Sequence, residues 1–224
     1  MNPRRLSHRE REDLRFFGKI TASVTHELNN VFGIIGENSG LLSDRMMRVE
    51  NNESIDREKI IKICETLQRH IERGQAVIKK LNTFAHSVDE PVGNFNLADA
   101  VQNTILLSSR FAYRKRVELN MAPVKGKVEI NSCRFLVQQA LFNGIMFMLN
   151  FSTSEDKMSL SLAKDRERAT ITINGADWPV EDVDEKTIQP LLDLMEYLGG
   201  ECVDEPEDGR LKLIFPVEYN QAGE

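Results

Sequence analysis

An unbroken helical pattern in the first part of the chain restricts the fold more than any other feature. Between residues 14 and 47, apolar side chains recur mostly at steps of three, four or seven: Phe17, Ile20, Val24, Leu28, Val31, Ile35 and Leu42. This spacing places them on one face of an α-helix and excludes a strand. A helix of roughly 40 residues is about 60 Å long, too long for a compact domain of this size to cover. It therefore needs a partner helix.

A second helical stripe follows a polar break. Residues 50–54 are typical of a turn, and apolar side chains at helical spacing then run from Ile60 to Phe84. These two stripes predict a helical hairpin with a wide apolar face left uncovered. A second copy would cover that face and complete a dimeric four-helix bundle with two-fold symmetry. The alternative is that the hairpin packs against the C-terminal half of its own chain.

Beyond residue 92 the pattern changes to that of an α+β fold. Asn96 is typical of a helix N-cap and precedes a helix over residues 97–110. The segments that follow predict strands at 117–121, 128–130, 158–163, 169–173 and 210–216, and helices at 135–150 and 188–198. We expect an α/β sandwich with one mostly antiparallel sheet and helices on one face. The predicted domains are the helical hairpin, 1–92, and the α/β domain, 93–224.

Composition and charge exclude several classes of function. The chain is 41% hydrophobic and 29% charged, an ordinary soluble composition. Its formal net charge of -6 gives no general electrostatic reason to bind nucleic acid or an anionic membrane. The longest apolar stretch, 135–151, is interrupted by polar residues and is short for a membrane span. The cysteines lack the spacing of a disulfide framework or a zinc site. We expect a cytoplasmic protein with no nucleic-acid partner, no membrane span and no metal site.

A histidine in the first helical segment is the strongest candidate for chemistry. His26 lies two residues from Val24 and two from Leu28, so its ring should point away from the apolar seam into water. Asn30, at i+4, shares its face, and Glu27 is adjacent in sequence. A neutral imidazole nitrogen can attack phosphorus while a carboxylate takes or orients the proton on the other nitrogen. A surface histidine alone is more often inert, so the surrounding motif decides.

Three segments resemble two-component sensor histidine kinases. Residues 17–30, FGKITASVTHELNN, resemble the H-box of that family, in the first helix of its dimerisation and phosphoacceptor domain. Residues 73–85, RGQAVIKKLNTFA, are similar to the end of the family's second helix. Residues 95–101, FNLADAV, are similar to the entry into its ATP-binding domain.

The resemblance implies roles for the residues around the histidine. His26 would be the phosphorylated residue and Glu27 its acid/base neighbour. Asn30 would occupy the position that helps to orient water when a response regulator is dephosphorylated. Val31 departs from the family, many of whose members have a proline there that bends the helix.

The C-terminal half resembles the family's ATP-binding domain in element order but lacks its nucleotide chemistry. Residues 139–147 are similar to the N-box, whose two asparagines lie four apart. Asn143 matches the first, but the second position, which would hold magnesium, is Phe147, and this side chain offers no oxygen. Asn174 stands where the family has an aspartate that accepts from adenine. Trp178 follows where flexible glycine is expected, and it is interpreted as a plug of the nucleotide space instead of a base-stacking residue.

No glycine-rich phosphate-binding segment or long lid is found between Gly175 and the helix near Ile188. The favoured interpretation is therefore a histidine phosphotransfer protein, similar to relay proteins that combine a kinase-like bundle with a degenerate ATP-binding domain. His26 would move a phosphoryl group between response-regulator aspartates. The alternatives are an ATP-independent pseudokinase scaffold and a response-regulator phosphatase. An active sensor histidine kinase is favoured least.

The expected partners are response-regulator receiver domains and a second copy of the chain. No cofactor is expected to bind this chain, since Mg²⁺ would come from the acidic pocket of the receiver domain. Docking would use residues near His26, with Phe16, Ser23 and Phe32 as candidates. For the two phenylalanines, packing inside the bundle is the alternative.

Overall fold

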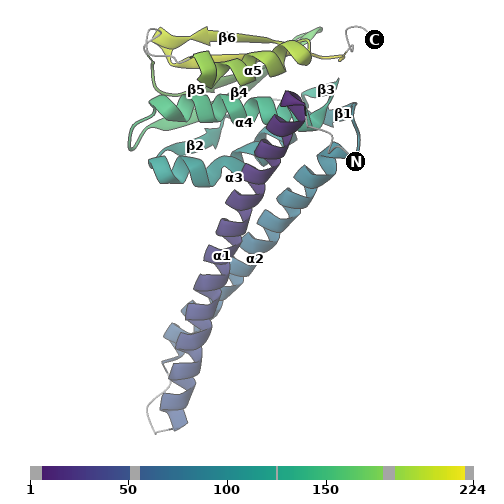
Figure 1. Cartoon of the computed structure of the whole chain (residues 1–224). Helices are drawn as coiled ribbons and strands as arrows, with labels where there is room; N and C mark the ends of the chain where they lie inside the picture. Colours follow the sequence, from purple (N-terminus) through teal and green to yellow (C-terminus); the bar gives the residue numbers. More distant parts are fainter. Residues whose placement is uncertain (1–6, 51–55, 125, 179–184, 220–224) are drawn as a thin grey trace. The chain divides into compact units, whose positions relative to one another are not determined.

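The computed structural model describes residues 7–50, 56–124, 126–178 and 185–219. The chain separates into two compact units, one of residues 17–82 and one that joins the start of the first helix, up to Phe16, to the chain from Thr83 onward. The described helices and strands are, in chain order, α1 (His8–Glu50), α2 (Arg57–Ala85), η1 (His86–Val88), β1 (Gly93–Asn96), α3 (Leu97–Lys115), β2 (Glu118–Met121), β3 (Glu129–Ser132), α4 (Arg134–Phe151), β4 (Lys157–Lys164), β5 (Arg168–Asn174), α5 (Glu185–Tyr197), β6 (Glu201–Glu205), η3 (Pro206–Asp208) and β7 (Arg210–Pro216) (Figure 1). The predicted division into the domains 1–92 and 93–224 stays a prediction.

Helices α1 and α2 form the predicted hairpin, and α1 runs without a break for 43 residues (Figure 1). The buried side chains of α1 in this unit include Ile20, Val24 and Val31, as the sequence predicts. The rest of the predicted seam is less covered: Phe17 is exposed, and Leu28, Ile35 and Leu42 are half-buried. One partner helix covers only a narrow stripe of a cylinder, so a broader apolar face keeps its flanks exposed. Of the predicted turn, only Glu50 lies among the described residues.

The second unit contains a five-stranded sheet in the order β2-β4-β5-β7-β6. Only β2 and β4 pair in parallel, so the sheet is mostly antiparallel, as predicted. The expectation of a single sheet is wrong, because β3 pairs with β1 in a separate two-stranded sheet. The side chain of Asn96 caps α3 as predicted, accepting from the backbone N–H of Ala98 at 3.2 Å. Its Oδ1 also accepts from Val128 N, which ties the cap to the residue preceding β3.

One face of the five-stranded sheet carries the hydrophobic core. Alternate residues of β4, β5 and β7 are fully or nearly fully buried: Met158, Leu160, Ala169, Ile171, Ile173, Leu211, Leu213 and Phe215. Helix α4 packs on β5 and β7, with α3 and α5 against it. A glycine permits the close approach, because a Cβ at position 144 would lie 2.9 Å from Ile173 Cδ1. Among the described residues, no helix combines the length and apolar character that a membrane crossing requires.

The start of α1 packs with the α/β unit. The ring of Phe16 lies 5.3 Å from that of Phe84, 5.4 Å from Phe135 and 5.2 Å from Phe142, measured between centroids. Two turns earlier, the guanidinium of Arg9 stacks over the ring of Tyr197, 4.3 Å from its centroid. Aromatic clusters and cation–π contacts of this kind stabilise by packing and by the ring quadrupole. The start of α1 thus packs against this unit through Phe16 and Arg9.

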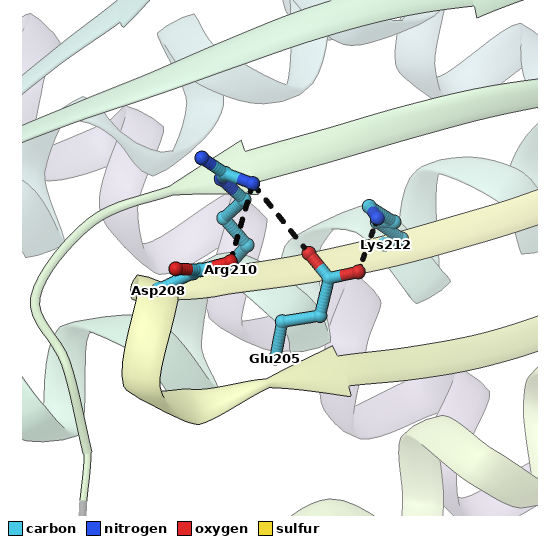
Figure 2. A network of polar contacts seen from close by, with 4 residues as sticks. All are labelled: Glu205, Asp208, Arg210 and Lys212. Carbon is cyan, nitrogen blue, oxygen red and sulfur yellow. Dashed lines mark hydrogen bonds and ion pairs between the residues drawn. The ribbon is translucent and has the colours of Figure 1, made fainter.

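A charged network surrounds the turn between β6 and β7. Figure 2 shows Glu205 of β6 between Arg210 and Lys212 of β7, and it also shows Arg210 reaching Asp208, at 3.4 Å. These side chains are partly exposed, so the network contributes little free energy. The turn ends at Gly209, whose φ of +60° favours glycine.

Candidate functional site

His26 lies on α1 outside the buried face of the helix. Its side chain is exposed, as the spacing from Val24 and Leu28 predicts. Asn30, one turn further on, is exposed as well, and its Nδ2 lies 3.3 Å from Nδ1 of the histidine ring. The side chains share a face because residues at i and i+4 are neighbours on a helix. The structure therefore brings together two of the three residues that the sequence singles out.

Glu27, the third residue, faces the second helix of the hairpin. Its Oε1 accepts hydrogen bonds from Arg73 of α2, at 2.9 Å from Nε and also from Nη2. The side chain of Glu27 is 20% exposed and that of Arg73 is 59% exposed. Within the described residues, no hydrogen bond joins Glu27 to the ring of His26. The carboxylate is thus engaged by a cation from the other helix.

The sequence assigns no role to Arg73, which enters only as the first residue of a family-like segment. A signal for it was present. Glu27 falls on the face of α1 that the hairpin covers, and a covered carboxylate needs a hydrogen-bonding or cationic partner. Helices α1 and α2 approach each other closely beside the contact between Glu27 and Arg73. Gly74 is buried, and a Cβ at that position would lie 3.2 Å from Cγ1 of Val31.

The predicted nucleotide-binding positions lie in the α/β unit. Asn143 is half-buried on α4, and Phe147, one turn later, is 2% exposed. The indole of Trp178 packs edge-on against Phe147, with centroids 5.6 Å apart, and stacks on Phe151 at 6.2 Å. Trp178 is 4% exposed. Three aromatic rings therefore fill the position at which the family resemblance places a magnesium ligand, and they offer no oxygen to a hard cation.

Asn174 ends β5 with its amide group already engaged. Its Nδ2 donates to the backbone oxygen of Ser159 at 3.2 Å. The next residue, Gly175, donates its N–H to the backbone oxygen of Gly209 at 2.9 Å, so the β6–β7 turn holds the chain that leaves β5. A Cβ at position 175 would lie 3.0 Å from Met148 Cε. Half of the segment between Gly175 and Ile188, residues 179–184, lies outside the described residues.

Two of the three residues suggested for partner docking are not available for it. Phe16 is 4% exposed inside a cluster of four phenylalanines, so it is buried, but in the α/β unit and not inside the bundle as its alternative had it. Ser23 is 3% exposed because it lies on the covered side of α1. Phe32 is 60% exposed and keeps both interpretations open.

The hairpin site suits nucleophilic chemistry on an anionic group. His26 offers an exposed imidazole with the hydrogen-bonding amide of Asn30 beside it. The guanidinium of Arg73 binds Glu27, the next residue in sequence after His26. Among the described residues, no group of three or more His, Cys, Asp or Glu side chains is arranged to hold a metal ion.

Comparison with known proteins finds similar chains but no matching family model. Over 158 residues, 70% of its length, the chain is 23% identical to the sensor protein DegM of Bacillus sp. (strain B21-2), and the match spans 38% of that protein. The match to the nucleotide-free catalytic domain of the histidine kinase ThkA covers 58% of this chain and all of that domain, with a TM-score of 0.51 and 12% identity. The match to the histidine kinase AdeS of Acinetobacter baumannii covers 82% of this chain and 95% of the AdeS chain, with a TM-score of 0.46 and 13% identity.

The matches to DegM and to the ThkA domain confirm the resemblance to the histidine kinases of two-component systems. The mixed α+β fold resembles that of histidine kinase catalytic domains. The chain is histidine-kinase-like, and it spans well under two thirds of the length of the sensor protein that it matches.

Proposed function

We propose that this chain is a histidine phosphotransfer protein that moves phosphoryl groups between response-regulator aspartates through His26. The observation that carries the proposal is the packing of Phe147 against Trp178 and Phe151, where an ATP-dependent kinase would need an oxygen ligand for magnesium. The residues at these positions do not fit a magnesium nucleotide. The exposed imidazole of His26 keeps the nucleophile that transfer requires.

The transfer needs no nucleotide on this chain. A ring nitrogen of His26 attacks the phosphorus of an aspartyl phosphate in line, and the N–P bond forms as the P–O bond breaks. The electron pair of that bond leaves with the aspartate carboxylate of the first regulator. The carboxylate of a second regulator then attacks the phosphohistidine and reverses these bond changes. Mg²⁺, held by the receiver domain of the partner, would neutralise charge on the phosphoryl oxygens.

Dimerisation through the hairpin is part of the same proposal. Both helices carry large apolar side chains that are at least 42% exposed: Phe32, Leu41, Met46 and Met47 on α1, and Ile61, Ile71 and Ile78 on α2. Single exposed apolar residues are ordinary, but a set distributed along two paired helices favours burial against further helices. A second copy offers a matching set, and a two-fold axis would bring the two sets together.

One labelling experiment separates the proposal from its alternatives. The chain is incubated either with radiolabelled ATP or with a labelled, phosphorylated receiver domain, as wild type and as His26→Ala, Asn30→Ala and Asn29→Ala. Asn29 is the matched control, because it is an exposed amide in the same helix without a hydrogen bond to His26. We expect label from the receiver only, and its loss in His26→Ala but not in Asn29→Ala.

The other outcomes each contradict the proposal in a different way. Label on His26 from ATP would make the chain a kinase. Release of phosphate from the receiver without labelled protein, lost in Asn30→Ala, would make it a phosphatase. No label and no release in any arm would leave a scaffold.

A further inference from the structure

The polar neighbours of His26 differ in what they can do for the ring. Oε1 of Glu27 accepts hydrogen bonds from two nitrogens of Arg73, on the other helix of the hairpin. Asn30 contacts the ring itself, with Nδ2 3.3 Å from Nδ1. By the family resemblance, the carboxylate of Glu27 would take or orient the proton of the imidazole. In this chain the residue in contact with the ring is Asn30, whose amide nitrogen points to Nδ1.

The orientation of the Asn30 amide decides which ring nitrogen can react. A neutral imidazole has one N–H and one nitrogen with a free lone pair, while an amide offers a donor at one end and an acceptor of similar shape at the other. In the structure Nδ2 lies towards the ring, so Nδ1 must accept, Nε2 carries the proton and neither nitrogen has a free lone pair. With Oδ1 towards the ring, Nδ1–H donates to the amide, and Nε2 keeps its lone pair.

We infer that Asn30 is the positioning residue that sets the reactive tautomer of His26, and that Glu27 serves the ion pair with Arg73 instead. This inference rests on the proposed phosphotransfer function. In the reactive form, the Asn30 amide is turned from the orientation in the structure so that Oδ1 accepts Nδ1–H, and the lone pair of Nε2 forms the N–P bond as the donor's P–O bond breaks. The proton on Nδ1 stays in place through the transfer. The phosphorylated ring is then cationic, and its Nδ1–H remains bonded to the amide oxygen.

The inference has a readout that does not involve any receiver domain. In the full chain with ¹⁵N-labelled histidine, nitrogen chemical shifts report which ring nitrogen of His26 is protonated, and His26→Ala identifies the signals. Phosphoramidate, a small donor, then phosphorylates the ring directly, and the product is assigned to Nε2 or Nδ1. The variants are Asn30→Ala, which removes the amide, Asn30→Asp, which keeps an acceptor for Nδ1–H, and the control Asn29→Ala.

We expect wild type, Asn30→Asp and Asn29→Ala to hold the proton on Nδ1 and to form the Nε2 product. Asn30→Ala should lower the ratio of the Nδ1–H to the Nε2–H form about fivefold, the factor that one hydrogen bond of ordinary net strength supplies. Glu27→Gln should leave this ratio unchanged. Equal ratios in wild type and Asn30→Ala, or a shift in Glu27→Gln alone, would overturn the inference. If the tautomer responds as expected but no receiver exchanges phosphate with His26, the proposed function fails and the role of Asn30 stands.

Discussion

Trp178 meets Phe147 edge to face, with ring centroids 5.6 Å apart and ring planes at 88°. The two residues come from different elements, since Phe147 lies in α4 and Trp178 follows β5. Both are almost fully buried, at 2% and 4% exposure, so the indole is part of the packed interior. A side chain packed to this extent contributes to the stability of the fold, and its removal leaves a cavity that the surroundings fill only in part.

Trp178→Ala is therefore expected to destabilise the chain by about 3–5 kcal/mol, the range found for large aromatic residues removed from a core. Thermal unfolding followed by circular dichroism measures the change. Tyr113→Ala is the matched control, because that aromatic side chain is 82% exposed and should change stability by less than about 0.5 kcal/mol. Equal stability of the two variants would mean that the indole does not plug the interior.

Phe16→Ala is expected to destabilise the α/β unit by about 3 kcal/mol or more, since Phe16 contacts three other rings and is 4% exposed. Leu14→Ala is the control, because Leu14 lies two residues earlier in the same helix and is 59% exposed. A double-mutant cycle with Phe142→Ala should give a coupling of about 0.5–1.5 kcal/mol. Coupling near zero would contradict the observed packing of α1 on α4.

Local patterns predicted the long elements well. The apolar repeat located α1 and α2, and the polar Asn96 located the start of α3, because both signals depend on residues close in sequence. The two strands without a predicted range, β1 and β6, are four and five residues long and have few β-branched side chains. Strand β1 forms through pairing with β3, and β6 is an edge strand with three acidic residues. Their signal lies in distant partners and not in their own sequences.

The candidate site divides in the same way. The contact between His26 and Asn30 follows from i,i+4 spacing, so one helix suffices to predict it. The pairing of Glu27 with Arg73 joins residues 46 apart in the chain and depends on the register of two helices, which periodicity alone does not determine. Phe16 was misplaced for the same reason, because its three ring partners lie at distant positions in the chain.

Substitutions of two helical glycines should have opposite effects. Gly74→Leu should destabilise the hairpin by about 1–3 kcal/mol, because the contact with Val31 leaves no room for a larger side chain. Gly36→Ala should stabilise it by about 1 kcal/mol, since alanine favours helix and a Cβ there has no atom within 4 Å. Chemical denaturation of each variant measures both changes. A stabilising Gly74→Leu would contradict the close approach of α1 and α2.

The three thiols should react at very different rates. Burial raises the pKa of Cys202 to about 12, and burial also raises the pKa of Cys133, so both hold little thiolate near neutral pH. Cys64 is exposed on α2. Ellman's reagent should therefore modify one thiol rapidly in the native chain and all three after denaturation. Cys64→Ser should remove the fast phase, and a fast phase that survives this change would contradict the burial of the other two.

The turn between β4 and β5 predicts a pH dependence of stability. Hydrogen bonds from the backbone N–H groups of Glu167 and Arg168, at 2.9 and 2.8 Å, lower the pKa of Asp165 below its ordinary value. The charged carboxylate is thus favoured in the folded state. Its contribution to stability is fully present above the pKa of the unfolded chain, about 3.9, and is lost as the pH falls through the lower folded pKa.

Asp165→Ala should accordingly be less stable than wild type near neutral pH, and the difference should shrink as the solution is acidified below about pH 4. Urea denaturation of both proteins across this range measures the difference. Asp208→Ala is the control, since Asp208 lies in a turn but its carboxylate pairs with a side chain, Arg210, at 3.4 Å. A difference between Asp165→Ala and wild type that grows on acidification would have the wrong sign for a carboxylate whose pKa is lowered by folding.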